Sequence, residues 1–502
     1  MELTTDVLVV GGSLNGLSTA VFLSHHGVAC LVVERHPDTS RHFRFRGVSA
    51  RSMELYRSAG AESAIAGAAT EHQRLGGVGR AANFAADEVN WLPTPWDADI
   101  SAFSPSTHTT CDQDQLEPVL RDHAVRAGAE TRFGTELIQW QQDADGVRAV
   151  VEDRSNGARH TVHARYLVAA DGTRSRIRDT LRIGRSGPGV LEHRMSVLFK
   201  TDVAPQLRGR QVTACIITDT GATLIPRANG LWMMTVPCDS QGLPEHRCVE
   251  LIKAALGRAD AQVDLVDALP WQSAALVADR FREGRVFLVG DAAHVMPPTG
   301  GFGGNTGIHD AHNLAWKLAA VLRGEADPAL LDTYEQERRP VALHTMDQAL
   351  ARLRRWFDGD TEPRIHDDNA VMFGYRYHSA AVIEERSATD TPFLDPHHLT
   401  ATPGTRAPHV NLGHGESTLD HYGPGFTLVV GPDAAPWWEA AESLRLQIHQ
   451  PPIPDWSATY GVTPSGAVLV RPDGFVAWRT QAGVDSPVES LRAVLSRIGL
   501  RA

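Results

Sequence analysis

Two glycine-rich segments have the residue types and the spacing that a negatively charged ligand requires. The first is GGSLNG at residues 11–16, and the second is the loop at residues 290–305, which contains Asp291. Each lies before a predicted helix, whose first turn offers free backbone N–H groups and the positive end of a dipole to an anion. Glycine lets that anion approach the backbone closely. A flexible turn with a capping residue fits either segment equally well when it is taken alone, so the neighbouring elements decide between the two interpretations.

Strand, glycine turn and helix follow one another at the N-terminus in the order that a dinucleotide-binding unit needs. Residues 6–10 form a predicted buried strand, residues 17–26 a predicted helix, and residues 29–33 a second strand. The second strand ends at Glu34, roughly 20 residues beyond the turn, where the fingerprint places the carboxylate that binds ribose. Ser13 replaces the second glycine of the fingerprint and weakens the match. Dinucleotide binding is still preferred to a plain α/β turn, because Glu34 agrees with it.

Three further segments carry polar residues close to the predicted ends of helices or strands. Arg46 lies in a basic loop, where it can pair with a phosphate or stay solvated. Gln113 is expected to be exposed at the start of a helix. The strand at residues 166–170 leads to Asp171 and Gly172, and an acidic residue at the carboxyl end of such a strand suits a cofactor crevice.

The second glycine-rich segment is predicted to be a strand, a loop and a helix. The strand at residues 285–289 brings Asp291 to the loop. Prolines and glycines between residues 297 and 304 are expected to prevent regular structure up to about Asn305, and apolar spacing beyond that point predicts a helix that ends at Gly324. The loop therefore places small residues at the N-terminus of a helix.

The pattern along the chain predicts an α/β fold with a discontinuous Rossmann-like domain, an inserted antiparallel-sheet domain and a small C-terminal domain. Short segments that alternate with period two between residues 186 and 271 predict the sheet, one face of which is apolar enough to cover a bound ring. Strands near residues 427–430, 467–470 and 475–478 predict a final domain of about 100 residues. The expected ranges are 1–72, 105–185 and 272–395 for the Rossmann-like domain, 73–104 and 186–271 for the sheet domain, and 396–502 for the C-terminal domain.

The composition excludes several classes of partner. The 502 residues carry a formal net charge of -12, which argues against nucleic acid or an anionic membrane surface. No apolar run approaches the roughly 20 residues that span a bilayer, and the N-terminus does not look like a signal peptide. The 5 cysteines are scattered and form no C-x-x-C, so we predict no metal site, no disulfide framework and a cytoplasmic location. The sequence leaves a homo-oligomer open.

Three separated segments agree with one another: residues 11–16 with Glu34, the Asp171-Gly172 pair, and Gly290-Asp291 with its loop and helix. Together they resemble the class A flavin-dependent aromatic hydroxylases, which share the p-hydroxybenzoate hydroxylase fold. The branch that hydroxylates phenols and aromatic polyketides carries a thioredoxin-like C-terminal domain, and further segments are similar to that branch. These segments are Gly374-Tyr375-Arg376-Tyr377, residues 403–409 and residues 469–474. No cysteine follows Cys248, so thiol redox chemistry in that domain is excluded.

The resemblance implies that the protein binds FAD. The glycine turn and the Asp171-Gly172 pair would serve the pyrophosphate, Glu34 the adenosine ribose, and Leu137 the adenine. Arg46, Gln113 and Asp291 would hold the ribityl chain or a phosphate, and residues 298–305 would line the isoalloxazine ring. The full set of cofactor residues implied in this way is Gly11, Gly12, Ser13, Gly16, Glu34, Arg35, Arg46, Gln113, Leu137, Asp171, Gly172, Asp291, Pro298, Gly301, Gly303, Gly304 and Asn305.

The same resemblance implies a monooxygenase that hydroxylates a phenolic or related small aromatic substrate, as in the biosynthesis of aromatic polyketide antibiotics. NADPH or NADH would reduce the flavin as a transient co-substrate, and O2 would then form a flavin C4a-hydroperoxide. The helix N-terminus at Gly304 and Asn305, together with Pro298, would form the flavin-ring environment and stabilise negative charge on the reduced ring. No side chain is assigned as a general acid or base.

An apolar pocket would keep water away from the reacting ring. Ordinary core packing is the preferred interpretation of each candidate pocket residue taken singly, and the candidates are Trp96, Phe103, Trp232, Met233 and Met234. Two alternative functions stay open, because motifs report the flavin site and not the position at which oxygen is added. They are a Baeyer–Villiger-type oxygenation by the same intermediate, and a flavin-binding protein without oxygenase activity.

Overall fold

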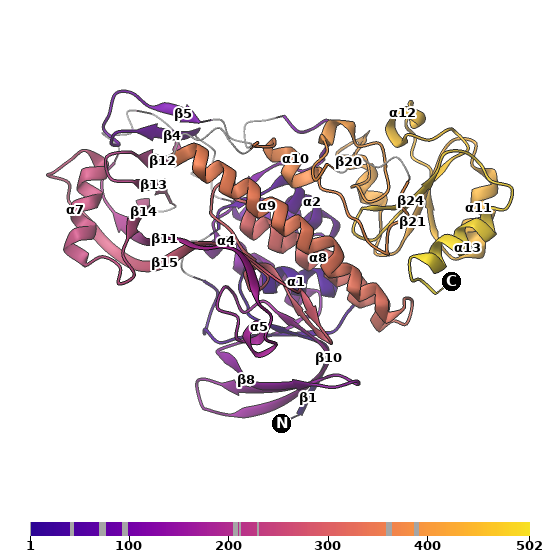
Figure 1. Ribbon diagram of the computed structural model, residues 1–502, viewed down its shortest axis with the longest axis horizontal. Helices are drawn as coiled ribbons and strands as arrows, with labels where there is room; N and C mark the ends of the chain where they lie inside the picture. Colours follow the sequence, from indigo (N-terminus) through magenta and orange to yellow (C-terminus); the bar gives the residue numbers. More distant parts are fainter. Residues whose placement is uncertain are drawn as a thin grey trace. The chain divides into compact units, whose positions relative to one another are not determined.

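We describe the fold from a computed structural model. It covers residues 2–40, 45–69, 77–92, 99–203, 209, 212–227, 230–357, 364–385 and 391–501. The chain forms two compact units: unit 1 consists of residues 1–66, 100–186 and 276–502, and unit 2 of residues 67–99 and 187–275. The Rossmann-like sheet, the central helices and the C-terminal sheet all belong to unit 1 (Figure 1).

A mainly parallel sheet organises the first part of unit 1, in the order β16-β17-β10-β1-β2-β7. Strands β17, β10, β1, β2 and β7 are parallel, and β8, β9 and β10 form an antiparallel extension. The apolar run at the end of β1 is fully buried, as expected for a strand covered on both faces. The strands are β1 (Glu2–Val10), β2 (Cys30–Glu34), β7 (Glu130–Phe133), β8 (Thr135–Gln142), β9 (Val147–Asp153), β10 (Arg159–Ala169), β16 (Arg282–Glu283) and β17 (Val286–Leu288).

The long helices α8 and α9 form the centre of this part of unit 1. Helix α8 is buried along almost its whole length, and α9 packs against it (Figure 1). A short ladder of β3 and β6 links the segment before α2 to the segment before α4. The elements are α1 (Leu14–His25), β3 (Gly47–Val48), α2 (Ala50–Ser58), α3 (Glu62–Ala68), β6 (Thr109–Thr110), α4 (Gln113–Arg126), α5 (Arg176–Thr180), η4 (Gly290–Ala292), β18 (His294–Val295), α8 (Phe302–Leu322), η5 (Pro328–Asp332), α9 (Thr333–Phe357) and α10 (Asp368–Phe373).

Helix α8 begins three residues earlier than the sequence pattern indicates. It starts at Phe302, so Gly303 and Gly304 lie inside its first turn and do not precede it. Gly301 is the N-cap and has a φ of +67°, a left-handed conformation that glycine adopts without strain. The expectation that these glycines prevent regular structure up to about Asn305 is wrong, because the left-handed turn ends at Gly301.

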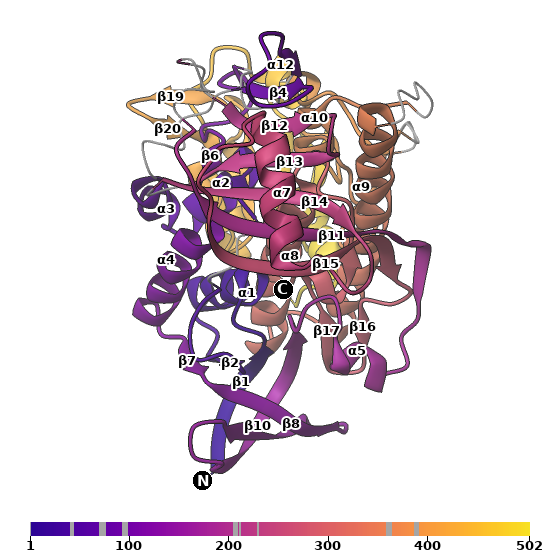
Figure 2. The ribbon, with the colours of Figure 1, turned by 90° about the vertical axis from the view of Figure 1, so that its left-hand side faces the viewer.

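Unit 2 is a sheet in the order β15-β11-β14-β13-β12-β4-β5, covered by helix α7 (Figure 2). The core beneath α7 contains Phe199, Leu224, Trp232 and Met234 together with Ile252 of the helix. The pairs β11–β14, β14–β13, β13–β12 and β4–β5 are antiparallel, whereas β12 and β4 are parallel. The elements are β4 (Gly77–Ala81), β5 (Asn90–Leu92), β11 (Arg185–Lys200), β12 (Val212–Ile217), β13 (Ala222–Pro226), β14 (Leu231–Cys238), α7 (Glu245–Leu256) and β15 (Asp264–Ala278).

The C-terminal part of unit 1 is built on a small sheet in the order β22-β21-β23-β24. Strands β21 and β22 are parallel, whereas β23 is antiparallel to both of its neighbours. This βαβ unit followed by two antiparallel strands and a helix has the topology of a thioredoxin core. The elements are η6 (Pro396–His398), β19 (Asn411–Gly413), β20 (Glu416–Ser417), η7 (Thr418–His421), β21 (Thr427–Val430), α11 (Ala435–Ser443), β22 (Gln447–His449), α12 (Trp456–Tyr460), β23 (Ala467–Val470), β24 (Val476–Thr480) and α13 (Pro487–Arg497).

Buried ion pairs connect this C-terminal part to the long helices of unit 1. Arg471 donates to both carboxylate oxygens of Glu337 on α9, at 2.6 and 2.9 Å. Lys317 of α8 lies 2.7 Å from the same carboxylate, and Arg471 also contacts Asp473 at 2.5 Å. We call Lys317, Glu337, Arg471 and Asp473 the buried charge cluster. A second buried pair joins Arg406 to Glu54 of α2.

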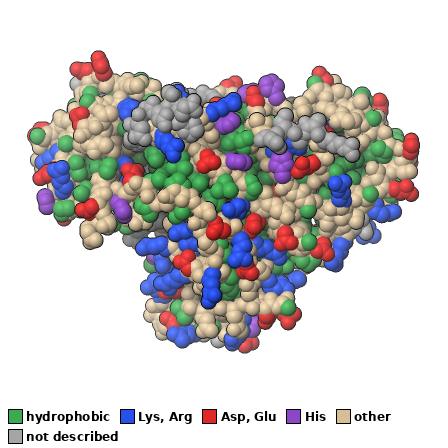
Figure 3. Space-filling model, viewed as in Figure 1, with side chains coloured by type: hydrophobic (Ala, Val, Ile, Leu, Met, Phe, Trp, Pro, Cys, Tyr) green, Lys and Arg blue, Asp and Glu red, His purple; other side chains and the backbone are tan. Residues whose placement is uncertain are grey.

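The surface carries charges of both signs, interspersed with polar and apolar side chains on the face in Figure 3. In the part of the chain that the structure describes, no helix has a stretch of sufficient length and hydropathy to cross a membrane.

Candidate functional site

The carboxyl ends of neighbouring parallel strands bring the predicted site segments together. Strand β1 leads into Gly11, β2 ends at Glu34, β10 leads to Asp171, and β17 leads to Gly290. These strands are adjacent in the sheet and point the same way, so their ends lie at one edge. Ligands of open α/β sheets bind at this edge.

The first glycine turn has no room for side chains at two positions. Gly11 has a φ of +108°, and a Cβ there would lie 2.2 Å from the carbonyl oxygen of Ala170. A Cβ on Gly16 would lie 1.8 Å from the carbonyl oxygen of Gly11. Both contacts are with backbone, which cannot move aside easily. The turn therefore needs glycine at both positions to bring helix α1 close to its strand.

Glu34 holds the turn from the neighbouring strand. The backbone N–H of Gly12 donates to its Oε2 at 2.7 Å, and the N–H of His36 donates to its Oε1 at 2.9 Å. Arg35 is exposed beside it. The carboxylate thus lies at the end of β2, next to the glycine turn, where a ribose carboxylate is expected.

Gln113 is buried, and the expectation that it is exposed at the mouth of its helix is wrong. Its amide donates to the Ser13 hydroxyl at 3.1 Å and to Glu117 at 2.6 Å. Residues four apart share one face of a helix, so Gln113 and Glu117 turn inward together. Glu117 also accepts hydrogen bonds from the Ser13 hydroxyl at 2.5 Å and from the N–H of Leu14 at 2.9 Å. Sequence analysis missed Glu117, although its i, i+4 spacing from Gln113 could have indicated it.

Arg46 lies close to a buried carboxylate. Its Nε is 3.4 Å from Oδ1 of Asp112, which is the N-cap of α4, and its side chain is largely buried. The backbone carbonyl of Arg46 accepts a hydrogen bond from Cys111. The alternative prediction, that the Arg46 side chain is solvated in a surface loop, does not agree with this burial. Leu137 lies on β8, half-buried and opposite Val151 of β9.

The two aspartate segments meet at the edge of the sheet. Thr173, just after Gly172, donates from its hydroxyl to Oδ2 of Asp291 at 3.3 Å. Asp171 accepts the N–H of Ile177 at the start of α5, and burial raises the pKa of its carboxyl group. The other carboxylate oxygen of Asp171 is buried without a hydrogen-bond partner among the described residues.

Asn15 joins the first glycine turn to the second. A Cβ on Gly290, which has a φ of +57°, would lie 1.9 Å from the Asn15 amide nitrogen. A Cβ on Gly307 of α8 would lie 2.4 Å from the same atom. The Asn15 side chain therefore occupies the space between the strand end and α8, and only glycine fits on both sides. The sequence analysis did not single out Asn15, Gly290 as a packing residue, or Gly307.

The loop before α8 is tied down through Asn305. Its side-chain oxygen accepts hydrogen bonds from the N–H of Ser49 at 2.9 Å and the hydroxyl of Ser52 at 2.7 Å. Its amide nitrogen donates to the carbonyl oxygens of Gly47 and Gly301, both at 2.9 Å. The Asn305 side chain thus positions the backbone of Gly47, Ser49 and Gly301. The N–H groups in the first turn of α8 are then the groups that can face a ligand.

The other loop residues differ in their surroundings. Pro298 is exposed, and Gly303 is half-buried with Met296 nearby. A Cβ on Gly304 would lie 2.4 Å from the ring of Phe45, so the absence of a side chain lets the segment before β3 approach the first turn of α8.

The candidate pocket residues that the structure describes fall in both units, and each is described within its own unit. Trp96 lies outside the described residues. Phe103 packs edge-on against Phe373 in a core cluster of unit 1, with ring centroids 5.2 Å apart. Trp232 and Met234 lie in the core beneath α7, whereas Met233 points to the other face of the sheet because strand residues alternate. These placements agree with ordinary core packing for Phe103, Trp232 and Met234.

Buried neutral histidines should make the fold sensitive to acid. Burial, and the nearby guanidinium of Arg51, lower the pKa values of His309 and His312 far below 6.5. Below pH ~6.5 these histidines are protonated in the unfolded chain but stay neutral in the folded protein. Their contribution to the free energy of unfolding is therefore fully present above pH ~6.5 and is lost as the pH falls. We expect the free energy of unfolding to drop by up to about 1.4 kcal/mol per pH unit for each histidine below that point.

Urea unfolding at pH 7.5, 6.5 and 5.5 measures this dependence. His309→Gln removes one titrating group and should flatten the slope between pH 6.5 and 5.5. Equal stability of the parent protein at all three pH values would contradict the prediction.

The residues present at the edge of the sheet fit an FAD molecule. Gly11 and Gly16 let the N-terminus of α1 pack closely against the end of β1 at this edge, and the buried oxygen of Asp171 without a described partner suits a hydrogen-bond donor of a ligand. Glu34 ends β2 beside the glycine turn, where the fingerprint places a carboxylate for ribose. A dinucleotide-binding α/β protein is the class that this fold and site define.

Comparison with known proteins agrees and is more specific. A family model described as FAD binding domain matches residues 4–349, and one described as aromatic-ring hydroxylase, C-terminal, matches residues 400–500. The chain belongs to the family of FAD-dependent aromatic-ring hydroxylases and is an FAD-dependent monooxygenase. The fold class, the cofactor FAD and the enzyme class predicted from the sequence are thereby confirmed.

Individual relatives match over nearly the whole chain. Tetracenomycin B2 monooxygenase-dioxygenase of Streptomyces olivaceus is 42% identical, with 98% of each chain covered. A 4-methyl-5-nitrocatechol 5-monooxygenase of Burkholderia sp is 39% identical, over 99% of this chain and 98% of the relative. The crystal structure of aklavinone-11 hydroxylase with FAD and aklavinone has a TM-score of 0.91 and 36% identity, with 98% of each chain covered.

Proposed function

We propose that this enzyme hydroxylates an aromatic polyketide or a related polycyclic phenol, with NADPH or NADH as the reductant and O2 as the oxygen source. The supporting observation is that relatives covering 98% of the chain are named for tetracenomycin, and that a solved structure at TM-score 0.91 contains aklavinone. A small phenol is the second candidate substrate, because the nitrocatechol monooxygenase is 39% identical over a similar length.

Bound FAD supplies electron transfer and oxygen activation, and the chain's residues hold and orient it. We assign Gly11, Gly12, Ser13 and Gly16 with Asp171 and Gly172 to the pyrophosphate, and Glu34 with Arg35 to the adenosine ribose. Leu137 serves the adenine. Arg46, Gln113 and Asp291 serve the ribityl chain or a phosphate. Pro298, Gly301, Gly303, Gly304 and Asn305 surround the ring, where the first-turn N–H groups of α8 stabilise negative charge on its reduced form.

Several finer assignments stay predictions alongside this proposal. They are the three-domain boundaries given above, the cytoplasmic location, the choice between NADPH and NADH, and any homo-oligomer. Baeyer–Villiger oxygenation remains the alternative outcome for the same site, because it differs in the product and not in the cofactor.

Substrate-dependent turnover tests the function directly. A tetracyclic polyketide phenol and a simple nitrocatechol should each be incubated with the FAD-bound enzyme, NADPH and ¹⁸O2. We expect the polyketide to stimulate NADPH oxidation and to gain one labelled oxygen on a ring carbon. Labelled oxygen inserted between carbons would indicate Baeyer–Villiger chemistry, and NADPH oxidation that neither compound stimulates would oppose both substrate classes.

Replacing Asp291 with alanine tests the assignment of the cofactor residues. The change removes a charged hydrogen-bond acceptor, which is worth about 1.5–3 kcal/mol, or roughly a 10- to 150-fold loss of FAD affinity. The ratio of flavin to protein after purification, and titration of the apoprotein with FAD, measure the effect. Asp145→Ala, at an exposed position in the hairpin between β8 and β9, is the control. Full flavin content in Asp291→Ala would remove this residue from the site.

A further inference from the structure

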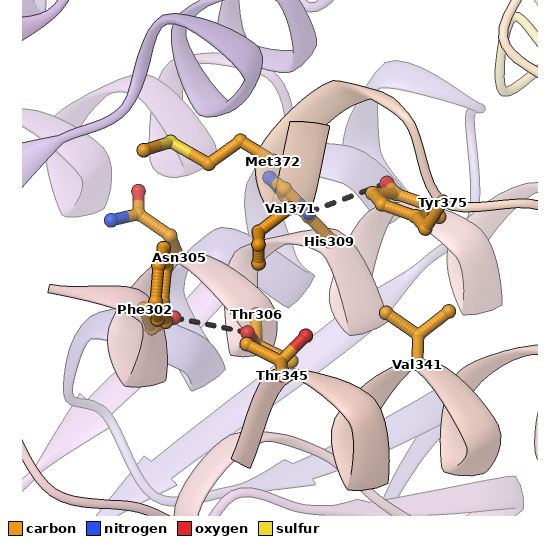
Figure 4. Close-up of a pocket in the computed structure, with 9 residues that line it drawn as sticks. All are labelled: Phe302, Asn305, Thr306, His309, Val341, Thr345, Val371, Met372 and Tyr375. Carbon is orange, nitrogen blue, oxygen red and sulfur yellow. Dashed lines mark hydrogen bonds between the residues drawn. The ribbon is translucent and has the colours of Figure 1, made fainter. Parts of the chain in front are cut away.

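A chain of buried side-chain hydrogen bonds runs through the interior of unit 1 to Asn305. The Ser52 hydroxyl lies 2.7 Å from the Asn305 side-chain oxygen and 3.2 Å from Nε2 of His309. Nδ1 of His309 lies 3.3 Å from the Tyr375 hydroxyl. All of these side chains are buried. Figure 4 shows Asn305, His309 and Tyr375 around a small cavity, with the bond between Tyr375 and His309 dashed. We call Tyr375, His309, Ser52 and Asn305 the polar chain.

The direction of each bond in the polar chain follows from the partners of Asn305. Its side-chain oxygen faces the backbone N–H of Ser49, which can only donate, and its nitrogen faces the carbonyl of Gly301, which can only accept. The amide orientation is therefore unique. The Ser52 hydroxyl must donate to this oxygen, so it accepts from His309. Nε2 of His309 then carries the proton, and Nδ1 accepts from the hydroxyl of Tyr375.

This arrangement requires a neutral imidazole, and the surroundings of His309 provide one. The guanidinium groups of Arg338 and Arg51 and the imidazole of His312 surround it, and burial together with these groups lowers its pKa well below the ordinary value. The Arg338 guanidinium also lies over the ring of Tyr375, 5.5 Å from its centroid. Two cationic groups from α2 and α9 thus oppose a proton on His309, so the ring keeps one N–H and one acceptor nitrogen.

A small cavity lies beside the polar chain. It is lined by Phe302, Asn305, Thr306, His309, Val341, Thr345, Val371, Met372 and Tyr375. A side chain that faces a void lacks packing contacts on that side. His309 and Tyr375 both line the cavity, and their hydrogen bonds restrain them together with ring contacts, such as that of Tyr375 with Phe475 at 5.5 Å between centroids.

The polar chain ends on backbone atoms of the loop before α8. Through its amide nitrogen, Asn305 holds the carbonyl oxygens of Gly301, the N-cap of α8, and of Gly47, at the start of β3. The first-turn N–H groups of α8 follow directly. Any loosening of Asn305 therefore moves the segments on both sides of this helix terminus.

We propose that Ser52 and His309 are positioning residues of the oxygenation reaction, which hold Asn305 and thereby aim the first-turn N–H groups of α8 at the flavin ring. The proposal rests on the proposed function of that helix terminus. It predicts that breaking the chain changes the electronic environment of bound flavin and the rate of turnover while FAD and substrate still bind, because Ser52 and His309 are buried and act through Asn305.

Ser52→Ala is the decisive variant, and Tyr375→Phe is a milder one that removes a single oxygen atom. Loss of one buried hydrogen bond at the positioning end corresponds to about a tenfold fall in kcat for Ser52→Ala, with KM for the aromatic substrate within about twofold. We expect a smaller fall, about threefold, for Tyr375→Phe. The visible absorption spectrum and the reduction potential of bound FAD should shift in the same order. His309→Gln keeps an N–H for Ser52 and should stay closer to the parent than His309→Leu.

Thr345→Val is the matched control. Thr345 is buried on the α9 wall of the same cavity, and valine has nearly the same shape, so this change tests packing without touching the polar chain. It should leave the flavin spectrum, the potential and kcat within about twofold of the parent, because it removes no hydrogen bond of the polar chain. The spectrum and the potential are measured on FAD-bound enzyme without substrate or NADPH, so they test the polar chain even if the substrate assignment fails. A Ser52→Ala enzyme with the flavin spectrum, potential and kcat of the parent would overturn the proposal, as would equal shifts in Thr345→Val.

Discussion

Replacement of Arg471 by alanine is expected to lower the free energy of unfolding by about 3–5 kcal/mol, the range for breaking a buried ion pair by removing one partner. Arg471 and Glu337 are both fully buried and share two hydrogen bonds, and the variant leaves Glu337 with Lys317 as its remaining cation in the buried charge cluster. Burial alone would raise the pKa of Glu337, but Arg471 and Lys317 together lower it below its ordinary value. Denaturant unfolding of the FAD-bound enzyme, followed by circular dichroism, measures the change.

An exposed ion pair provides the comparison. Arg247 and Glu250 lie one turn apart on α7, with side chains 53% and 58% exposed, and their bond is 2.7 Å long. Arg247→Ala should cost no more than about 1 kcal/mol, because water screens the pair and solvates the partner that remains. If the two variants had the same stability, the buried charge cluster would not be what connects the C-terminal part to α8 and α9. The C-terminal part has no cysteine for thiol redox chemistry. Packing onto α8 and α9 through the buried charge cluster is the role that its buried polar residues suggest.

Replacement of Gly16 by alanine is expected to abolish FAD binding or folding. The new Cβ would lie 1.8 Å from the carbonyl oxygen of Gly11, so α1 must move away from the end of β1. Overpacking costs about 1–3 kcal/mol, and a contact with backbone belongs at the upper end, which is roughly a 100-fold loss of FAD affinity if the fold survives. Flavin content after purification and FAD titration of the apoprotein measure the loss.

A glycine in an open helix position is the control for this variant. In the part of the chain that the structure describes, a Cβ at Gly67 of α3 meets no atom within 4 Å, and the residue is exposed. Gly67→Ala should keep full flavin content and gain up to about 1 kcal/mol, because alanine is the better helix former. Normal FAD affinity in Gly16→Ala would show that the close contact between α1 and the glycine turn is not required.

Structural features that involve residues close together in the sequence could be predicted from the sequence. The order of strand, glycine turn, helix and Glu34 involves residues that lie within about one βαβ unit, whose geometry sets the spacing. Gly11, Gly16 and Glu34 accordingly lie where the fingerprint puts them, with Glu34 bonded to Gly12. Three strands of the C-terminal part were also predicted, near residues 427–430, 467–470 and 475–478, and β21, β23 and β24 lie there.

Features that depend on the environment of a side chain were predicted less well. Gln113 looked exposed because it begins a helix, but its burial depends on Ser13 of another element. Core packing of Trp232 and Met234, by contrast, was the preferred interpretation of each residue taken singly, and both lie in the core beneath α7. The start of α8 was misplaced because glycine permits both a left-handed turn and a helix, and Gly301 and Gly304 use different options.

The sequence by itself therefore determined the family, the order of the predicted cofactor segments and the required glycines of the first turn, because those features are local or repeat a known spacing. Only the tertiary structure decided which polar side chains meet. Ser52 and Asn305 are separated by 253 residues, and Arg471 and Glu337 by 134. No periodicity links positions so far apart. Their pairing follows from the packing of α2, α8, α9 and the C-terminal part, in which each buried polar group must find a partner.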